Sequence, residues 1–373
     1  MIQLQAERRG PFPEAFLCFV FLLKVICYAD IRDGIIQTPF CLMERRNTMR
    51  ALVLPKPGRP DTLQLAELPV PQPGPGEIRV RIRAAGLNPI DYKVSPGGHP
   101  AWTYPFVLGI DAAGIVDEVG EGVTRWKAGD RVVYLADFTK PGAYAEYSIT
   151  TAHSVAAIPE GISFVHAAAF PCAGLTAYQV LNRKMHIARG QSILVHAGAG
   201  GVGSYAIQLA KAFGASKIIA TASPANFEYV QGLGADEVVD YSSEDVHERV
   251  LELTGGEGVD LILNSLNRAT AQKDLSVLAF GGQLACIAGA PETVADFQPS
   301  SKSFSLHKLM LGGAFGSRKA EEDLARMAEE FMQLMLANRL VPIVQEVVKL
   351  EQVPEALVRL SERHVRGKIV AEL

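Results

Sequence analysis

The chain has 373 residues, of which 48% are hydrophobic and 20% are charged. This composition is typical of a well-buried globular protein, and the length favours two domains. The formal net charge is −4 and no basic run occurs, which argues against a nucleic acid as the main partner. The five cysteines form no C-x-x-C pair, so they indicate neither a disulfide framework nor a zinc finger, and we expect a cytoplasmic protein.

Residues 1–48 precede the first domain pattern. Within them residues 15–29 are strongly apolar, but this stretch is short for a transmembrane helix and is interrupted by Lys24. A signal peptide is an alternative, although an acidic residue and two prolines follow the first arginines and no clear small-residue cleavage site comes after. We therefore expect an N-terminal extension that is poorly ordered or precedes the natural start, and no membrane partner.

A β-rich unit begins at Met49. Residues 77–85 alternate Ile78, Val80 and Ile82 with arginines, which is the pattern of a half-buried strand. Further strands are predicted over residues 49–54, 63–67, 114–119 and 130–135.

From about Pro171 strands and helices alternate. Such alternation predicts an α/β fold with a parallel, doubly wound sheet. The predicted strands are 192–196, 217–221, 236–240, 259–264 and 283–288, and the predicted helices are 226–233, 245–253 and 271–278. After about Leu311 we expect a long amphipathic helix over 320–338, a strand over 344–348, a helix over 354–362 and a last strand over 368–373.

A glycine loop follows the strand predicted at 192–196. Gly198, Gly200 and Gly203 complete G-x-G-x-x-G, with Gly201 and Val202 inside the motif, and apolar residues then recur at helical spacing. The first glycine permits a tight turn, the second admits a pyrophosphate and the third allows close packing of the helix. The motif indicates a dinucleotide site; the alternative is an ordinary glycine-rich turn.

The second strand of this unit ends without an acidic residue. An acid there would take the ribose hydroxyls of NADH, so its absence favours NADPH. Thr221, Ser223 and Asn226 can donate hydrogen bonds to a 2′-phosphate, although Ser223 and Asn226 could instead cap the next helix. No Lys or Arg stands on this loop, so Lys211 or a more distant residue would have to supply the positive charge.

Several separated motifs together resemble the medium-chain dehydrogenase/reductase superfamily. They lie at residues 85–91, 109–114, 142–147, 173–178, 198–203 and 367–370. The resemblance implies a GroES-like catalytic domain (49–171 and 312–373) split around an inserted Rossmann NADP-binding domain (172–311), with the active site between them. It also implies a homodimer joined along an edge strand near 283–288 or 310–315.

Zinc alcohol dehydrogenases of this superfamily have a cysteine where this chain has Asn88, and His-Glu where it has Ile110 and Asp111. Their third ligand position is still a cysteine here, Cys172. One thiolate and one carboxylate cannot make a three-ligand catalytic site, so we expect no metal. This indicates the zinc-independent branch of quinone oxidoreductases, enone reductases and enoyl reductases. The run from Asn88 to Lys93 looks like the motif of that branch.

The same resemblance implies further site residues. Thr176 and Asn264 would lie near the nicotinamide half of the cofactor, Tyr241 along the adenosine phosphate and Lys368 near the cleft. Asn88, Asp91 and Lys368 are also candidate cofactor-binding residues. The candidate proton donors are Tyr92, Lys93 and Tyr144, with Asn88 as an orienting amide, although water could also protonate the product. Trp102, Tyr104, Phe138 and Tyr144 are candidates for the pocket wall.

Without zinc a carbonyl lacks its Lewis acid, so hydride addition to an activated alkene or quinone is the easier reaction. We therefore expect an NADPH-dependent reductase of small conjugated carbonyl or quinone substrates, with NADH a weaker cofactor. Two alternatives stay open. One is a zinc-independent or zinc-binding alcohol or aldehyde dehydrogenase, and the other is an NADP(H)-binding protein without significant turnover.

Overall fold

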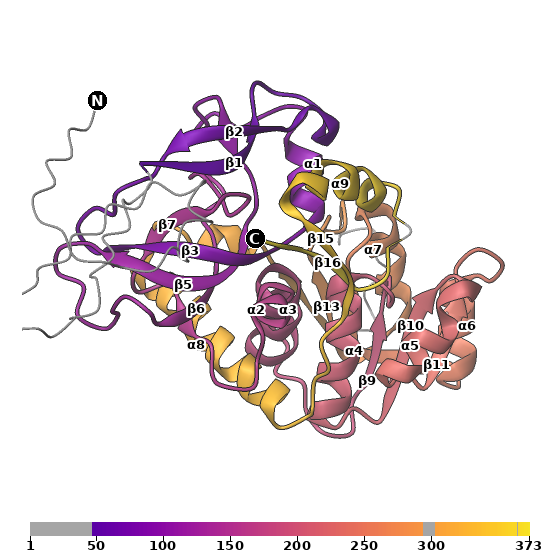
Figure 1. Cartoon of the computed structure of the whole chain (residues 1–373). Coiled ribbons are helices and arrows are strands. Elements are labelled where there is room, and N and C mark those ends of the chain that lie inside the picture. Colours follow the sequence, from indigo (N-terminus) through magenta and orange to yellow (C-terminus); the bar gives the residue numbers. More distant parts are fainter. Residues whose placement is uncertain (1–46, 294–302, 364) are drawn as a thin grey trace, which may run out of the picture. The chain divides into compact units, whose positions relative to one another are not determined.

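The computed structural model describes residues 47–293, 303–363 and 365–373 (Figure 1). The expectation for residues 1–48 therefore falls almost wholly outside the described residues. Within the described ranges, no helix is long and apolar enough to cross a membrane.

The β-rich part consists of two sheets. A small sheet has the strand order β2-β1-β4, and a larger one has the order β15-β16-β3-β5-β6-β8, with β7 also paired to β3. The strands are β1 (Thr48–Leu54), β2 (Gln64–Pro69), β3 (Glu77–Gly86), β4 (Phe106–Val107), β5 (Asp111–Val119), β6 (Arg131–Leu135), β7 (Tyr147–Thr151), β8 (Ala156–Ala157), β15 (Val344–Lys349) and β16 (Lys368–Glu372). The C-terminal strand β16 thus pairs with β3, although the two strands are far apart in the sequence (Figure 1).

The second part contains a six-stranded parallel sheet of order β11-β10-β9-β12-β13-β14. Its strands are β9 (Ser192–Val195), β10 (Lys217–Ala222), β11 (Glu237–Asp240), β12 (Val259–Asn264), β13 (Leu278–Cys286) and β14 (Phe304–Lys308). Ile193, Leu194 and Val195 of the central strand β9 are all fully buried, as expected for a strand covered on both faces. The predicted parallel, doubly wound sheet is confirmed.

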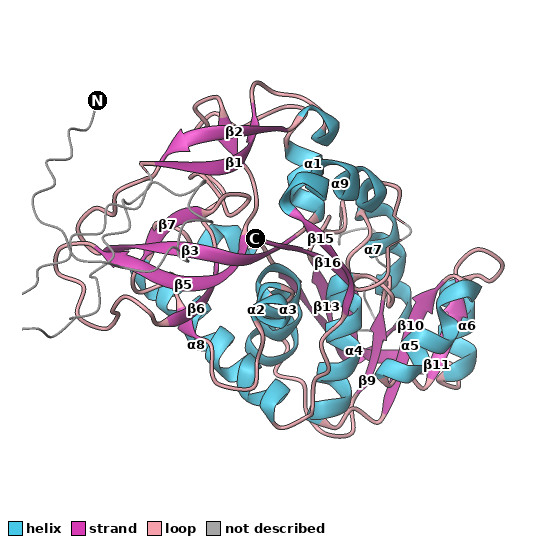
Figure 2. Ribbon diagram, in the orientation of Figure 1, coloured by secondary structure: helices cyan, strands magenta, loops and turns pink. Residues whose placement is uncertain are grey.

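Figure 2 distinguishes the strand-rich part around β3, β5 and β6 from the part in which helices and strands alternate. The α-helices of the described residues are α1 (Pro89–Val94), α2 (Phe164–Ala168), α3 (Pro171–Tyr178), α4 (Gly201–Phe213), α5 (Phe227–Leu233), α6 (Val246–Leu253), α7 (Arg268–Asp274), α8 (Arg318–Leu336) and α9 (Val353–Ser361). Thr48–Leu373 forms one compact unit, so the division into residues 49–171 with 312–373 and residues 172–311 stays a prediction.

The edge of the parallel sheet differs from the prediction. β13 is an interior strand, paired to both β12 and β14, and Leu311–Ala314 is a short 3-10 helix. Neither 283–288 nor 310–315 is therefore an edge strand, and that expectation is wrong. The edge strands are β11 and β14, and β14 has mostly exposed side chains and no sustained apolar run.

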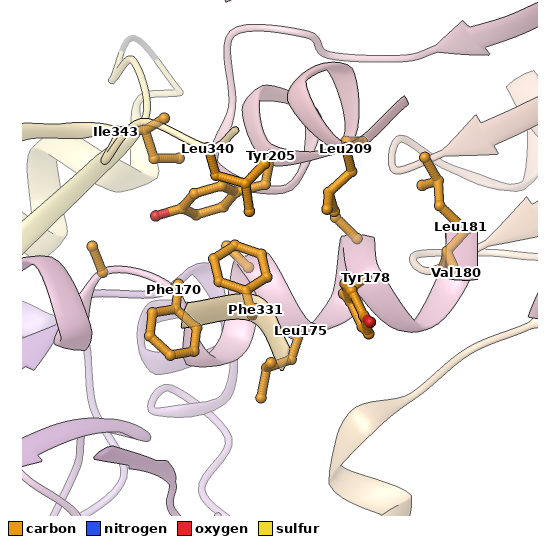
Figure 3. Packing of buried hydrophobic residues seen from close by; sticks show 14 of the residues in the cluster. Phe170, Leu175, Tyr178, Val180, Leu181, Tyr205, Leu209, Phe331, Leu340 and Ile343 are labelled. Carbon is orange, nitrogen blue, oxygen red and sulfur yellow. The ribbon is translucent and has the colours of Figure 1, made fainter. Parts of the chain in front are cut away.

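Helix α8 packs on α3 and on the strands β6 and β8. Its apolar residues recur at helical spacing, with Leu324, Met327, Ala328 and Phe331 all buried. The Phe331 ring stacks on Phe170, with centroids 4.8 Å apart, and meets the Tyr205 ring edge-on at 5.1 Å. Figure 3 shows Phe331 between side chains of α3, α4 and the segment before β15.

Replacing Phe331 by Ala should lower the free energy of unfolding by about 3–5 kcal/mol, because no neighbouring side chain can fill the cavity between two rigid rings. Urea-induced unfolding of the purified variant measures the loss. Leu336→Ala on the same helix, where the side chain is 41% exposed, is the matched control and should change stability far less. Equal losses for the two variants would contradict this account of the core.

Candidate active site

The glycine loop joins β9 to α4. Gly203 packs so closely on the Ala197 carbonyl oxygen that a Cβ would overlap it. Gly200 is extended backbone at the N-terminus of the 13-residue helix α4, and no described side chain caps that end. The loop therefore leaves a cradle at a helix N-terminus, and its residues fit a dinucleotide pyrophosphate.

Thr221 supports this loop from β10. Its Oγ1 accepts a hydrogen bond from the Ala197 amide at 3.0 Å, and its carbonyl oxygen accepts one from the Gly198 amide at 2.8 Å. The side chain is 1% exposed. Thr221 thus holds the shape of the glycine loop, whereas the sequence suggested a direct phosphate contact.

Beyond Thr221, the loop at the end of β10 is met by an arginine that the sequence analysis did not single out. Asn226 Nδ2 donates to Ser223 Oγ at 3.0 Å. Arg366 Nε donates to Asn226 Oδ1 at 2.6 Å, and its Nη2 donates to the Ala225 carbonyl at 2.5 Å. The only sequence signal was that Arg366 directly precedes the Gly367-Lys368 motif.

Lys211 does not lie at this loop. Its side chain packs against Gly234, which ends α5, while Asn226 precedes that helix. α5 connects the parallel strands β10 and β11, so it runs back along them and its two ends lie at opposite ends of the strands. Of the two sources of charge suggested by the sequence, the geometry favours a more distant residue over Lys211.

Residues 366–368 join the two parts of the site. The Gly367 amide donates to the Ala199 carbonyl at 2.9 Å, and Gly367 forms a parallel bridge with Gly200. The aliphatic stem of Lys368 lies next to Gly201. This segment of the β-rich part therefore lies directly on the glycine loop.

The Lys368 ammonium ends in a buried polar centre. Its Nζ donates to the Leu87 carbonyl at 2.9 Å, to Asn88 Oδ1 at 2.7 Å and to Asp111 Oδ2 at 2.9 Å. Asn88 Nδ2 also donates to Asp111 Oδ2 at 2.9 Å, and the Cys172 amide donates to Asp111 Oδ1 at 2.7 Å. Lys368 is 4% and Asp111 0% exposed, so a charge pair is held inside the protein with every partner in place.

This centre brings together Asn88 and Cys172, which stand where zinc dehydrogenases carry cysteine ligands, and Asp111, which follows the position of their His. Here an ammonium group stands between two of them. Burial and the neighbouring Asp111 raise the pKa of the Cys172 thiol to about 12, so it is not available as a thiolate. A catalytic zinc ion needs three protein ligands, and these residues do not fit one. Within the described ranges, no other cluster of three His, Cys, Asp or Glu residues could hold a metal.

Tyr144 and Asp91 form a second buried pair beside this centre. Tyr144 is 0% exposed, and its hydroxyl donates to Asp91 Oδ2 at 2.7 Å. Asp91 Oδ2 also accepts a hydrogen bond from the backbone N–H of Asn88 at 2.9 Å, which fixes the start of α1. Burial raises the pKa of Asp91 to about 6 and that of Tyr144 well above its ordinary value. This geometry commits the Tyr144 hydroxyl to Asp91 and gives no support to a role for it as proton donor.

The other two candidate donors are more accessible. Tyr92 is half-buried and Lys93 is exposed, next to each other on α1. Partial burial and the charge of Arg363 lower the pKa of Lys93, which makes it a better acid. Tyr241 is 59% exposed. Thr176 is nearly buried, and its hydroxyl donates to the Cys172 carbonyl at 2.6 Å.

Asn264 ends β12 and is held by a network that the sequence gave no sign of. It is fully buried, and its Nδ2 donates to Asp274 Oδ2 at 2.6 Å. The other carboxylate oxygen, Asp274 Oδ1, lies 2.9 Å from His196 Nε2 and 3.0 Å from His247 Nε2. Burial alone would raise the pKa of Asp274, but these hydrogen bonds outweigh it and bring the pKa to about 2.

The expected pocket aromatics pack on one another. Trp102 stacks on Phe106 with centroids 4.4 Å apart, and its Nε1 donates to the Phe138 carbonyl at 2.9 Å. Tyr104 meets the Trp102 ring edge-on at 6.5 Å. Their part in a substrate pocket stays a prediction.

Comparison with known proteins agrees with this geometry. Residues 74–160 match the alcohol dehydrogenase GroES-like domain, and residues 201–333 match the zinc-binding dehydrogenase family. A quinone oxidoreductase from Pseudomonas aeruginosa is 36% identical over 317 residues, covering 84% of this chain and 96% of that protein.

Two solved structures are similar over 87% of this chain. The Escherichia coli quinone oxidoreductase in complex with NADPH has a TM-score of 0.78 at 33% identity and is covered over 100% of its length. The CurK enoyl reductase has a TM-score of 0.77 at 28% identity and is covered over 99%.

The chain belongs to the medium-chain dehydrogenase/reductase superfamily, with a GroES-like domain and a Rossmann domain. Within that superfamily it belongs to the quinone oxidoreductase and enoyl reductase branch, and it is an oxidoreductase. The family, fold class and enzyme class predicted from the sequence are thus confirmed.

Replacing Lys368 by Met should destabilise the protein by about 3–5 kcal/mol, because Asp111 is left buried without its counter-charge. Urea-induced unfolding at neutral pH measures the loss. Adding Asp111→Asn to the same chain should recover part of it, since neither charge then remains. Lys56→Met, at an exposed position, is the control. A double variant no more stable than Lys368→Met would contradict the ion pair's role.

Asp274→Asn should be less stable than the parent protein at pH 7 by roughly 2 kcal/mol, as follows from a carboxyl pKa lowered to about 2. The lowered pKa of Asp274 stabilises the folded state at pH values above 3.8, the pKa of the unfolded chain. This stabilisation is lost as the pH falls toward 2. The stability gap between variant and parent should therefore shrink from pH 4 downward in urea titrations. A gap that does not depend on pH would argue against a charged Asp274. Asp61→Asn, at an exposed position, is the control.

Proposed function

We propose that this protein is a zinc-independent, NADPH-dependent reductase that transfers hydride to an activated alkene or a quinone. The observation that carries the proposal is the Lys368 ammonium, which lies beside an intact glycine loop and among the positions where zinc dehydrogenases place their ligands. The NADPH complex of the similar Escherichia coli enzyme supports the cofactor.

The chain's own residues supply binding, orientation and charge. The N-terminus of α4 binds the pyrophosphate. The segment 366–368 holds the buried polar centre around Lys368 against the glycine loop. When bound, the nicotinamide supplies the hydride. Lys368 is saturated by three acceptors, so it does not act as a free acid or polarise a carbonyl. A substrate that spreads negative charge over its own conjugated system suits such a site.

The proton that follows the hydride comes from the accessible face of α1. Lys93, with its lowered pKa, is the first candidate and Tyr92 the second, with water as the remaining source. Asn88 takes part by positioning, because both ends of its amide are already used by Asp111 and Lys368. We propose further that two copies pair along β14, an edge strand of the parallel sheet, and that the protein is cytoplasmic.

The deciding assay follows the oxidation of NADPH and of NADH at 340 nm, in metal-free buffer with and without a chelator. An enone, a quinone and an aldehyde are offered separately. We expect NADPH oxidation with the enone or the quinone, unchanged by chelator. Activity with the aldehyde alone, lost on chelation, would make the protein a metal-dependent alcohol or aldehyde dehydrogenase. NADPH binding without turnover on the whole panel would make it a binding protein.

A further inference from the structure

Within the described ranges, no carboxylate pairs with the positive charge of Arg366. Its guanidinium is bound by the Asn226 amide oxygen and the Ala225 carbonyl oxygen, both of them neutral. No ion pair to Arg366 occurs among the residues that the structure describes. Arg366 is half-buried, and a guanidinium bound by two neutral acceptors can still pair with an anion.

The place of this charge defines which anion fits. Ser223 and Asn226 follow β10, the second strand of the parallel sheet, where the adenosine ribose of a bound dinucleotide lies. That strand end holds no acid and no lysine. Arg366 reaches it from a segment 140 positions later in the chain. The group at a ribose 2′-position that requires a positive charge is a phosphate.

We infer that Arg366 is the residue that selects NADPH over NADH, by binding the 2′-phosphate together with Ser223 and Asn226. This inference rests on the proposed function. Arg366 exchanges its neutral acceptors for phosphate oxygens, which form shorter and stronger charge-assisted hydrogen bonds. Ser223 Oγ and Asn226 Nδ2, which now bond to each other, become available as further donors.

The position of Arg366 also connects this selection to the rest of the site. Gly367 is bonded to the glycine loop, and Lys368 to Asn88 and Asp111. A phosphate that binds Arg366 therefore also holds residues 366–368, which connect the glycine loop to Asn88 and Asp111. An adenosine fragment with a 2′-phosphate should bind without any nicotinamide.

The test measures equilibrium binding to the full chain by calorimetry, with NADPH, NADH, adenosine 2′,5′-bisphosphate and adenosine 5′-monophosphate as ligands. For Arg366→Gln we expect the Kd for NADPH and for the bisphosphate to rise at least tenfold, with the Kd for NADH changed less than twofold. Unchanged NADH binding also reports that the variant is folded. Ala225→Lys added to Arg366→Gln should restore NADPH binding, since it returns a positive charge to the loop.

Two further variants keep the test decisive. Ala225→Glu leaves Arg366 in place but offers it a carboxylate on an exposed loop position, and it should also weaken NADPH binding. Arg363→Gln removes an exposed arginine of the same segment that lies near Lys93 instead, and it should leave the preference intact. A parent protein that prefers NADPH and an Arg366→Gln variant that keeps this preference would overturn the role of Arg366 alone. A parent protein without any preference would overturn the proposed cofactor as well.

Discussion

The rest of the site depends on the buried ion pair between Lys368 and Asp111. A carboxylate and an ammonium inside a protein persist only when each is fully paired, and here both are. The pair links β16 to β5 across the strand β3 that lies between them, close to Gly367 on the glycine loop and to Asn88 at the start of α1. A positive charge of the polypeptide itself thus stands between Asn88 and Asp111.

Much of the fold could be predicted because its signals are local. Apolar runs between glycines predicted β9, β10 and β12 to within a residue or so at each end, since these strands are buried on both faces. β14 was missed for the opposite reason: it is an edge strand, and most of its side chains are exposed. The glycine loop was found from its spacing, whereas Arg366 and Asp274 could not be found, because only the packing of distant segments brings them to Asn226 and Asn264.

Tyr144 illustrates a different limit. A tyrosine in a loop motif suggests a proton donor, and nothing in the sequence tells a buried hydroxyl from an accessible one. Gly109 has a left-handed backbone, and a Cβ there would collide with the Tyr144 ring. This close approach carries the ring into the core, where Asp91 takes its hydroxyl. The Tyr144 hydroxyl thus binds Asp91 of α1, and the accessible residues of α1 remain the proposed source of the proton.

The separation of the paired charges along the chain also constrains the order in which the protein assembles. Asp111 and Lys368 are 257 positions apart, and the whole parallel sheet lies between them. During synthesis the early strands leave the ribosome with a gap beside β3 and an unneutralised carboxylate, and only the completed Rossmann segment can bring β16 into that gap. Such non-local pairing is slow, so the nascent β-rich half passes through a stage at which its unpaired strand is open to chaperones.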